Sequence, residues 1–149
     1  MLLTPHILAG VAVFTQTQNP ILGLIFVVLC HYLLDFPPQT EYSIDRIKSR
    51  QWKESAPDFL KVFLDIALGL FVIVLIVGFT PLILTAAFLA IFPDGLTLLH
   101  HIFPSNRLLK RHLKIHAKIN AICADKKIPA FWGIVSQVIV IVLAIYFLI

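Results

Sequence analysis

The sequence has little charge. Its 149 residues include only 12 Lys and Arg and 8 Asp and Glu, which is 13% of the chain, while 59% of the residues are hydrophobic. Soluble domains carry about 25% charged residues. A chain of this length cannot hide so much apolar surface in a soluble core, so the composition excludes an ordinary soluble domain and predicts a polytopic membrane protein.

Cysteine is also scarce. Cys30 and Cys123 are the only two cysteines, which argues against a disulfide framework, and we expect both to be small buried hydrophobes. No basic segment precedes the first apolar run and no small-x-small site follows it, so we expect no cleavable signal peptide. The net charge of +4 does not indicate nucleic-acid binding, because the basic residues lie in loops beside apolar runs, where membrane topology and anionic lipids explain them.

The pattern of apolar runs predicts an all-α fold, with about five membrane helices and one amphipathic helix in a single integral membrane domain over residues 1–149. Thr4 before Pro5 is typical of a helix start, and the prolines near residues 20, 37 and 93 indicate breaks. The predicted helices are 5–17, 21–35, 56–79, 81–92 (extending to 101 if the helix continues past Pro93), 106–124 and 130–149. The second helix would be roughly 22 Å long, shorter than the roughly 30 Å hydrocarbon core. The first two helices therefore either cross a thinned region or form a re-entrant hairpin.

Basic residues lie on one side of the predicted domain. Segments 37–58 and 100–129 hold every Lys and Arg except Lys61, while the turns at 16–20 and 80–81 hold none. The positive-inside rule then places the N terminus in the cytoplasm and the C terminus on the opposite side. We therefore expect a multi-pass protein of the cell (inner) membrane.

The segment 105–125 separates into two faces at helical periodicity. One face is basic, with Arg107, Lys110, Arg111, Lys114 and Lys118. The other is largely apolar and carries Leu108, His112, Ile115, His116, Ile119, Ile122 and Cys123. This pattern predicts an amphipathic helix at the inner membrane surface, with both histidines turned toward the bundle or the bilayer.

His31 and Asp35 are four residues apart and share a helix face. They could supply one nitrogen and one oxygen ligand to a metal ion; the alternative is a hydrogen bond between the two side chains that ties two helices together. Asp35 ends a helix, where the helix dipole disfavours a carboxylate. A nearby cation would relieve that repulsion.

Two further carboxylates lie in or beside apolar runs. Asp94 follows Pro93 near the same end of the membrane, either as a ligand or as a turn residue that caps a short helix. Asp65 lies inside the third helix, where an ionised carboxylate costs about 2.5–3.5 kcal/mol at mid-membrane. It is either a ligand or the ion-pair partner of Lys61. Either aspartate could act as a general base.

Three histidines complete the set. His6 lies in the first turn of the first helix at the same level, although a lone histidine there is usually an interfacial residue. His112 and His116 have a spacing common in zinc sites; the alternative is a pair of neutral histidines in a helix contact. Leu113 stands where zinc metalloproteases have glutamate, which excludes that mechanism.

Five predicted helices thus bring imidazoles and carboxylates to one depth, and we predict a divalent metal site there. A mixed set of nitrogen and oxygen ligands favours zinc, with manganese or iron as alternatives, over magnesium or calcium. The predicted metal ligands are His6, His31, Asp35, Asp65, Asp94, His112 and His116.

Several short motifs lie among these residues: Thr4-Pro5-His6-x-x-x-Gly10, His31-x-x-x-Asp35 before Pro37-Pro38, and Pro93-Asp94. Together they resemble the family of inner-membrane, metal-dependent hydrolases (the YdjM-like group), which is similar to zinc-dependent phospholipase C. The resemblance covers most of the chain. It implies a helical membrane protein with a divalent-metal site and hydrolase activity, with His6, His31, Asp35 and Asp94 among the site residues.

Two functions are consistent with this sequence. The first is a membrane-bound, metal-dependent hydrolase acting on an ester or phosphoester of a lipid-like substrate at the cytoplasmic membrane face. Asp65 or Asp94 would be its general base, and the basic face of the amphipathic helix would attract anionic lipid head groups. The second is a non-enzymatic metal-binding or lipid-associated membrane scaffold, which the small size of the chain favours.

Overall fold

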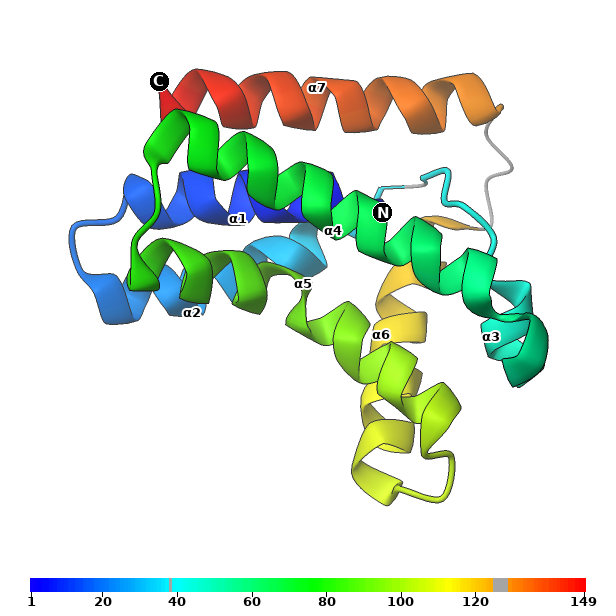
Figure 1. The fold of residues 1–149 in the computed structure, drawn as a ribbon. Coiled ribbons are helices and arrows are strands. Elements are labelled where there is room, and N and C mark those ends of the chain that lie inside the picture. The colour runs from blue at the N-terminus through cyan, green and yellow to red at the C-terminus, as the bar shows by residue number, and fades with distance from the viewer. Residues whose placement is uncertain (38, 125–128) are drawn as a thin grey trace.

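The computed structural model describes residues 1–37, 39–124 and 129–149, with the side chains of 121–124 and 130 left out of the description. The described residues form helices and connecting segments without β-strands, so the predicted all-α fold is confirmed (Figure 1). The elements are α1 (Leu3–Thr15), α2 (Pro20–Leu34), α3 (Asp45–Lys48), the 3-10 helix η1 (Trp52–Glu54), α4 (Ala56–Val77), α5 (Pro81–Ile102), α6 (Arg107–Ala124) and α7 (Ala130–Leu148).

Three of these helices are long and apolar enough to cross a membrane. They are α4, α5 and the segment Phe131–Leu148 of α7, and the shorter helices α1 and α2 are also apolar. Large apolar side chains are exposed on their outer faces, including Phe63 and Phe71 on α4 and Val142 on α7. Water would disfavour so much exposed apolar surface, whereas lipid chains would not. The structure is therefore consistent with a membrane protein.

The helix α1 lies at the centre of the bundle and packs against α2, α4, α5 and α7. Its residues Ile7, Leu8 and Val11 are buried in the core. Gly10 allows a close approach, because a Cβ atom there would lie 2.6 Å from Cβ of Ala90 on α5. This contact brings the first turn of α1 to the level at which α2 ends and α5 bends.

Two features of the predicted helices need correction. The predicted N-cap Thr4 lies inside α1, which begins at Leu3 with Leu2 as its N-cap. The predicted break at Pro93 is instead an internal position of the continuous helix α5. Pro93 has no N–H to donate to the carbonyl four residues earlier, and its ring crowds that turn, which bends a helix without ending it. Figure 1 shows α5 changing direction near its middle.

The helix α6 runs across the direction of the other long helices (Figure 1). It packs against α5, and the two form a hairpin that extends from the end of the bundle where the N terminus lies. The turns between α1 and α2 and between α4 and α5 lie at the opposite end, beside the C terminus. The side chains of Ile122 and Cys123, which were predicted on the apolar face of α6, lie outside the described residues.

Candidate metal centre

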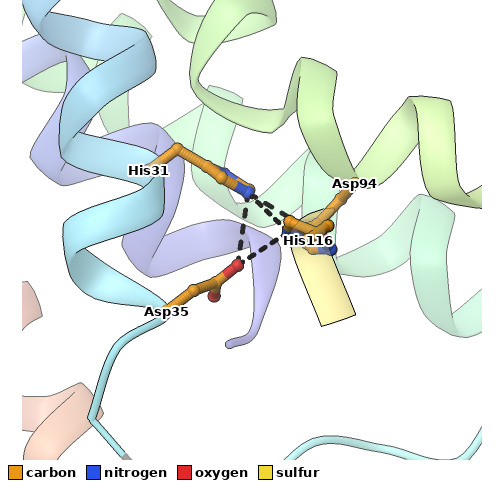
Figure 2. Close-up of side chains that lie close together, drawn as sticks. All are labelled: His31, Asp35, Asp94 and His116. Atoms are coloured by element: carbon orange, nitrogen blue, oxygen red, sulfur yellow. Dashed lines mark hydrogen bonds and ion pairs between the residues drawn. The ribbon is translucent and has the colours of Figure 1, made fainter. Parts of the chain in front are cut away.

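In a cluster of side chains, Asp35 faces the imidazoles of His31 and His116 (Figure 2). It directly follows α2, and its carboxylate is buried. Its Oδ2 atom lies 2.9 Å from Nε2 of His116 and 3.3 Å from Nε2 of His31. Its Oδ1 atom lies 3.1 Å from Nε2 of His6 and 3.2 Å from the amino group of Met1. A buried carboxylate needs such partners, because burial otherwise disfavours its charge.

The partners of Asp35 keep it ionised. Burial alone would raise the pKa of Asp35, but hydrogen bonds from His116, His31 and His6 and the charge of the nearby amino group lower it well below its ordinary value. Burial alone would lower the pKa of His116, but the hydrogen bond to Asp35 and the charge of Asp94 raise it. The pair thus holds a proton at a position where a metal ion could replace it.

His31 is held in one orientation by the backbone of α5. Its Nδ1 atom lies 2.7 Å from the carbonyl oxygen of Ala90. A carbonyl only accepts, so Nδ1 donates to it, and Nε2 is the ring nitrogen that faces the cluster. Metal-binding histidines are usually oriented in this way by a second hydrogen bond. The bend at Pro93 lies one turn after Ala90, which places this carbonyl in the distorted part of α5.

His116 joins the cluster from α6 and is buried. Its Nε2 atom lies 3.2 Å from Nε2 of His31, and its Nδ1 atom lies 3.4 Å from the hydroxyl of Thr97 on α5. Two imidazole nitrogens at this separation repel each other unless a proton or a metal ion lies between them or beside them. The arrangement therefore suits a cation-binding site.

Asp94 closes the cluster from α5. Its Oδ1 atom lies 3.6 Å from Nε2 of His116 and 3.9 Å from Nε2 of His31. Its side chain is 25% exposed, whereas that of Asp35 is 1% exposed. Asp94 is thus the carboxylate on the open side of the cluster.

The four side chains His31, Asp35, Asp94 and His116 could hold a metal ion, since one ligand atom of each lies within 4.8 Å of the others. In a tetrahedral zinc site with bonds of about 2.0–2.1 Å, neighbouring ligand atoms are roughly 3.3 Å apart. The distances from the histidine nitrogens to each other and to Asp35 are 3.2, 3.3 and 2.9 Å. The two distances to Asp94 are slightly longer. Little movement would be needed to bind an ion.

His6 lies beside this group of four. It is buried, and its ring stacks on that of His31 with the ring centroids 4.2 Å apart. Its Nε2 atom faces Oδ1 of Asp35, and Oδ2 of Asp94 lies 3.9 Å away. The structure therefore brings five of the seven predicted ligands together.

His112 lies one turn from His116, but its partner differs from the predicted metal ion. Its Nε2 atom lies 2.9 Å from the carbonyl oxygen of Pro93, to which it donates a hydrogen bond. Burial lowers the pKa of His112. The ring stacks on that of His116, with centroids 5.5 Å apart. This arrangement corresponds to the predicted alternative of a histidine in a helix contact, and it ties α6 to the bend in α5.

Asp65 also has a role that differs from both predicted ones. Its carboxylate accepts hydrogen bonds from the backbone amides of Leu3 and Thr4, at 2.7 and 3.0 Å, and from the Thr4 hydroxyl at 2.6 Å. It therefore caps the N terminus of α1, where unpaired amides and the helix dipole favour a negative charge. Lys61, the predicted ion-pair partner, instead lies 3.4 Å from Asp58. Asp65 is not part of the metal-binding group.

A pocket of about 400 Å³ opens beside the cluster. Asp94 and His116 line it, so the pocket reaches the candidate ligands. Most of its other lining side chains are apolar, and Lys48 and Glu41 add charges. Its apolar lining includes Leu3, Val62, Ile66, Ile91, Leu98 and Leu113.

No protein-family model, curated protein or solved structure matches this chain. The resemblance to the YdjM-like group stays a prediction.

Three polar residues near the site were not predicted. Thr97 contacts His116, and Tyr42 lies beside Asp65. Gln137 of α7 accepts from the amide of Leu2 at 3.2 Å and donates to the carbonyl of Thr40 at 2.8 Å. A buried amide in an otherwise apolar helix is a signal that could have identified Gln137. Thr97 and Tyr42 carry no comparable sequence signal, since hydroxyl groups are common near helix ends.

Proposed function

We propose that the chain is a membrane-bound, metal-dependent hydrolase that acts on an ester or phosphoester of a lipid-like substrate. The observation that carries this proposal is the convergence of His31, Asp35, Asp94 and His116 beside a largely apolar pocket, which Asp94 and His116 line. Two imidazoles and carboxylate oxygens are ligands that zinc binds well, and zinc is the ion we propose.

His31, His116 and Asp35 would hold the ion. All three are buried, and His31 is oriented by a backbone carbonyl. Two histidines and one carboxylate form a ligand set found in hydrolytic zinc sites, with the fourth position open. A divalent ion bound there lowers the pKa of a coordinated water and polarises the bond to be cleaved.

Asp94 is the group placed to accept a proton in this proposal. Its carboxylate lies on the open side of the cluster and lines the pocket, where a substrate would enter. General bases must lie within hydrogen-bond reach of the water that they deprotonate. Its Oδ1 atom lies farther from the nitrogens of His31 and His116 than the oxygen of Asp35 does, so Asp94 is the carboxylate that a water molecule would displace from the ion more readily.

The pocket indicates the kind of substrate. Its apolar side chains would bind an acyl chain, while Lys48 would attract a negative group near the mouth. We propose that the N terminus, α6 and the site lie on the cytoplasmic side of the inner membrane, because the basic segments lie at that end. The exposed Lys110, Arg111 and Lys114 of α6 would then contact anionic head groups. The resemblance to the YdjM-like group adds support for a hydrolase.

The first test is the metal content of the detergent-purified chain, measured by mass spectrometry. We expect stoichiometric zinc in the wild type and a loss of most of it in His31→Ala. His100→Ala is the matched control, because His100 lies outside the metal-binding group, and it should keep its metal. Wild-type protein without a stoichiometric transition metal would refute the proposal.

The second test is turnover. Metal-loaded wild type is assayed with panels of carboxylic esters, phosphomonoesters and phospholipids in mixed micelles. We expect Asp94→Asn to keep the ion held by His31, Asp35 and His116 and to lose at least about 100-fold in kcat, in line with the contribution of general bases. Full activity of Asp94→Asn would rule out its assignment as the base.

One observation favours a second candidate, a non-enzymatic metal-binding membrane scaffold. If Asp94 binds the ion directly, the four protein ligands close the coordination sphere, which is typical of structural zinc sites. In that case no ester in the panels is hydrolysed, and Asp94→Asn weakens metal binding and thermal stability together.

A further inference from the structure

The carboxylates Asp35 and Asp94 each divide their two oxygens between different histidines. Oδ2 of Asp35 and Oδ1 of Asp94 face His31 and His116. Oδ1 of Asp35 and Oδ2 of Asp94 face His6 instead. The cluster therefore contains a second set of donor atoms next to the group of four.

His6 supplies the nitrogen of that second set. Its Nε2 atom lies 3.1 Å from Oδ1 of Asp35 and 3.9 Å from Oδ2 of Asp94. Its side chain is fully buried, and its other ring nitrogen, Nδ1, has no hydrogen-bond partner among the residues that the structure describes. A buried polar ring with one unsatisfied side is costly to keep for packing alone. Within the described parts of the chain, the polar contacts of His6 are with the carboxylates of Asp35 and Asp94.

The nitrogens that His6 and His31 contribute to the two sets of donor atoms also lie side by side. The rings of His6 and His31 are stacked, with centroids 4.2 Å apart and an angle of 25° between their planes. Their Nε2 atoms therefore approach the same carboxylates from neighbouring positions. The distance of 4.2 Å between the ring centroids is close to the separation of about 3.5–4 Å between the two ions of two-metal hydrolytic sites.

We propose that the site binds two divalent ions, bridged by the carboxylate of Asp35. This inference rests on the proposed function, since it adds an ion to the same site. The first ion is held by His31, His116 and Oδ2 of Asp35. The second is held by His6, Oδ1 of Asp35 and Oδ2 of Asp94, which leaves Oδ1 of Asp94 free to accept a proton beside the first ion.

Oδ1 of Asp35 already faces a cation, the amino group of Met1 at 3.2 Å. A divalent ion at this oxygen would replace that charge, since the two would repel each other if both stayed. Each ion would have three protein ligands, and so each would keep an open position for water or substrate. A single ion bound by all four side chains of the first group would have no such position.

The test uses the full chain in detergent, stripped with EDTA and reloaded with Mn²⁺. Mass spectrometry should find two ions per chain in the wild type and in the control His100→Ala, and one ion in His6→Ala. Electron paramagnetic resonance of the wild type should show an exchange-coupled pair, and His6→Ala should show the spectrum of an isolated ion. Size-exclusion chromatography checks that His6→Ala remains folded.

One ion per chain in saturated wild type, with an uncoupled spectrum, would overturn the two-ion centre and leave the proposed hydrolase standing. No bound ion would overturn both. The wild-type spectrum decides the question even if His6→Ala does not fold.

Discussion

Asp35 and Asp65 are two acidic residues of the same bundle, and their surroundings give them opposite roles. Asp65 accepts from the amides of Leu3 and Thr4, which belong to the start of α1. Asp35 is surrounded by the imidazoles of His6, His31 and His116. Both carboxylates lie next to apolar helices. What differs between them is the kind of group that faces the carboxylate: backbone amides for Asp65 and imidazoles for Asp35.

The donors decide whether a metal ion can compete. A backbone amide has a hydrogen but no lone pair to give, so an ion cannot replace it without leaving the helix end unpaired. An imidazole can release its proton and bind the ion through the same nitrogen. A carboxylate among apolar helices is therefore a candidate metal ligand when imidazoles face it, and a structural cap when amides do.

The largest effect is expected from Asp35→Asn. The amide keeps the size of the side chain but removes the charge that faces three imidazoles, so we expect zinc affinity to fall by about 100-fold or more. Competition with a chromophoric chelator measures the affinity. Asp65→Asn is the matched control, and an equal loss in both variants would erase the distinction between the two carboxylates.

The next effect is expected from Asp65→Ala. Removing the cap leaves two amides and a hydroxyl at the start of α1 without their acceptor, and hydrogen bonds to a charged group contribute about 1.5–3 kcal/mol. We expect unfolding to become easier by about 3 kcal/mol, visible as a lower Tm in detergent, with metal stoichiometry retained. Lys61→Ala should change Tm little; a large change there would support the ion pair with Asp65 instead of the cap.

A smaller effect is expected from Thr97→Val, which removes the hydroxyl 3.4 Å from Nδ1 of His116. Groups that orient a metal-binding histidine contribute about 10-fold in affinity. Chelator competition should show that loss with the fold unchanged. Thr85→Val, at an exposed site on the same helix, should bind zinc like the wild type.

The smallest effect is expected at Tyr42, a neighbour of Asp65, and concerns how stability depends on pH. Burial and the neighbouring Asp65 carboxylate raise the pKa of Tyr42. The folded chain therefore keeps this proton at a pH where the unfolded chain loses it, so stability falls as pH rises above about 10. Tm measured between about pH 9 and 11 should fall less steeply in Tyr42→Phe. The slope should be unchanged in the control Tyr146→Phe, at an exposed tyrosine.

The helices could be predicted from the sequence because apolar runs and prolines determine where helices of this kind begin and end. The predicted ends lie within two residues of those observed in each long helix, once α5 is taken as continuous. The exception, Pro93, shows the limit of that reasoning. A proline predicts either a break or a bend, and contacts from other helices decide which occurs.

The candidate site could be predicted only in part. His31, Asp35 and Asp94 were identified because each lies near the same end of an apolar run, and His116 because it lies on the apolar face of the amphipathic helix. Their predicted depth in the membrane did not distinguish these four residues from Asp65 and His112. Those two lie at a similar level, but their side chains face backbone groups. Those partners come from distant parts of the chain, so no local pattern contains them.

The position of His116 along the chain has a consequence for the unfolded state. This residue lies against His31 and Asp35, which precede it by 85 and 81 residues along the chain. An ion bound to these side chains is a reversible crosslink that closes most of the polypeptide into a loop, and such closure restricts the unfolded chain much as a disulfide does. A chain with only two cysteines would thereby gain, from a metal ion, the kind of restraint that other small proteins obtain from sulfur.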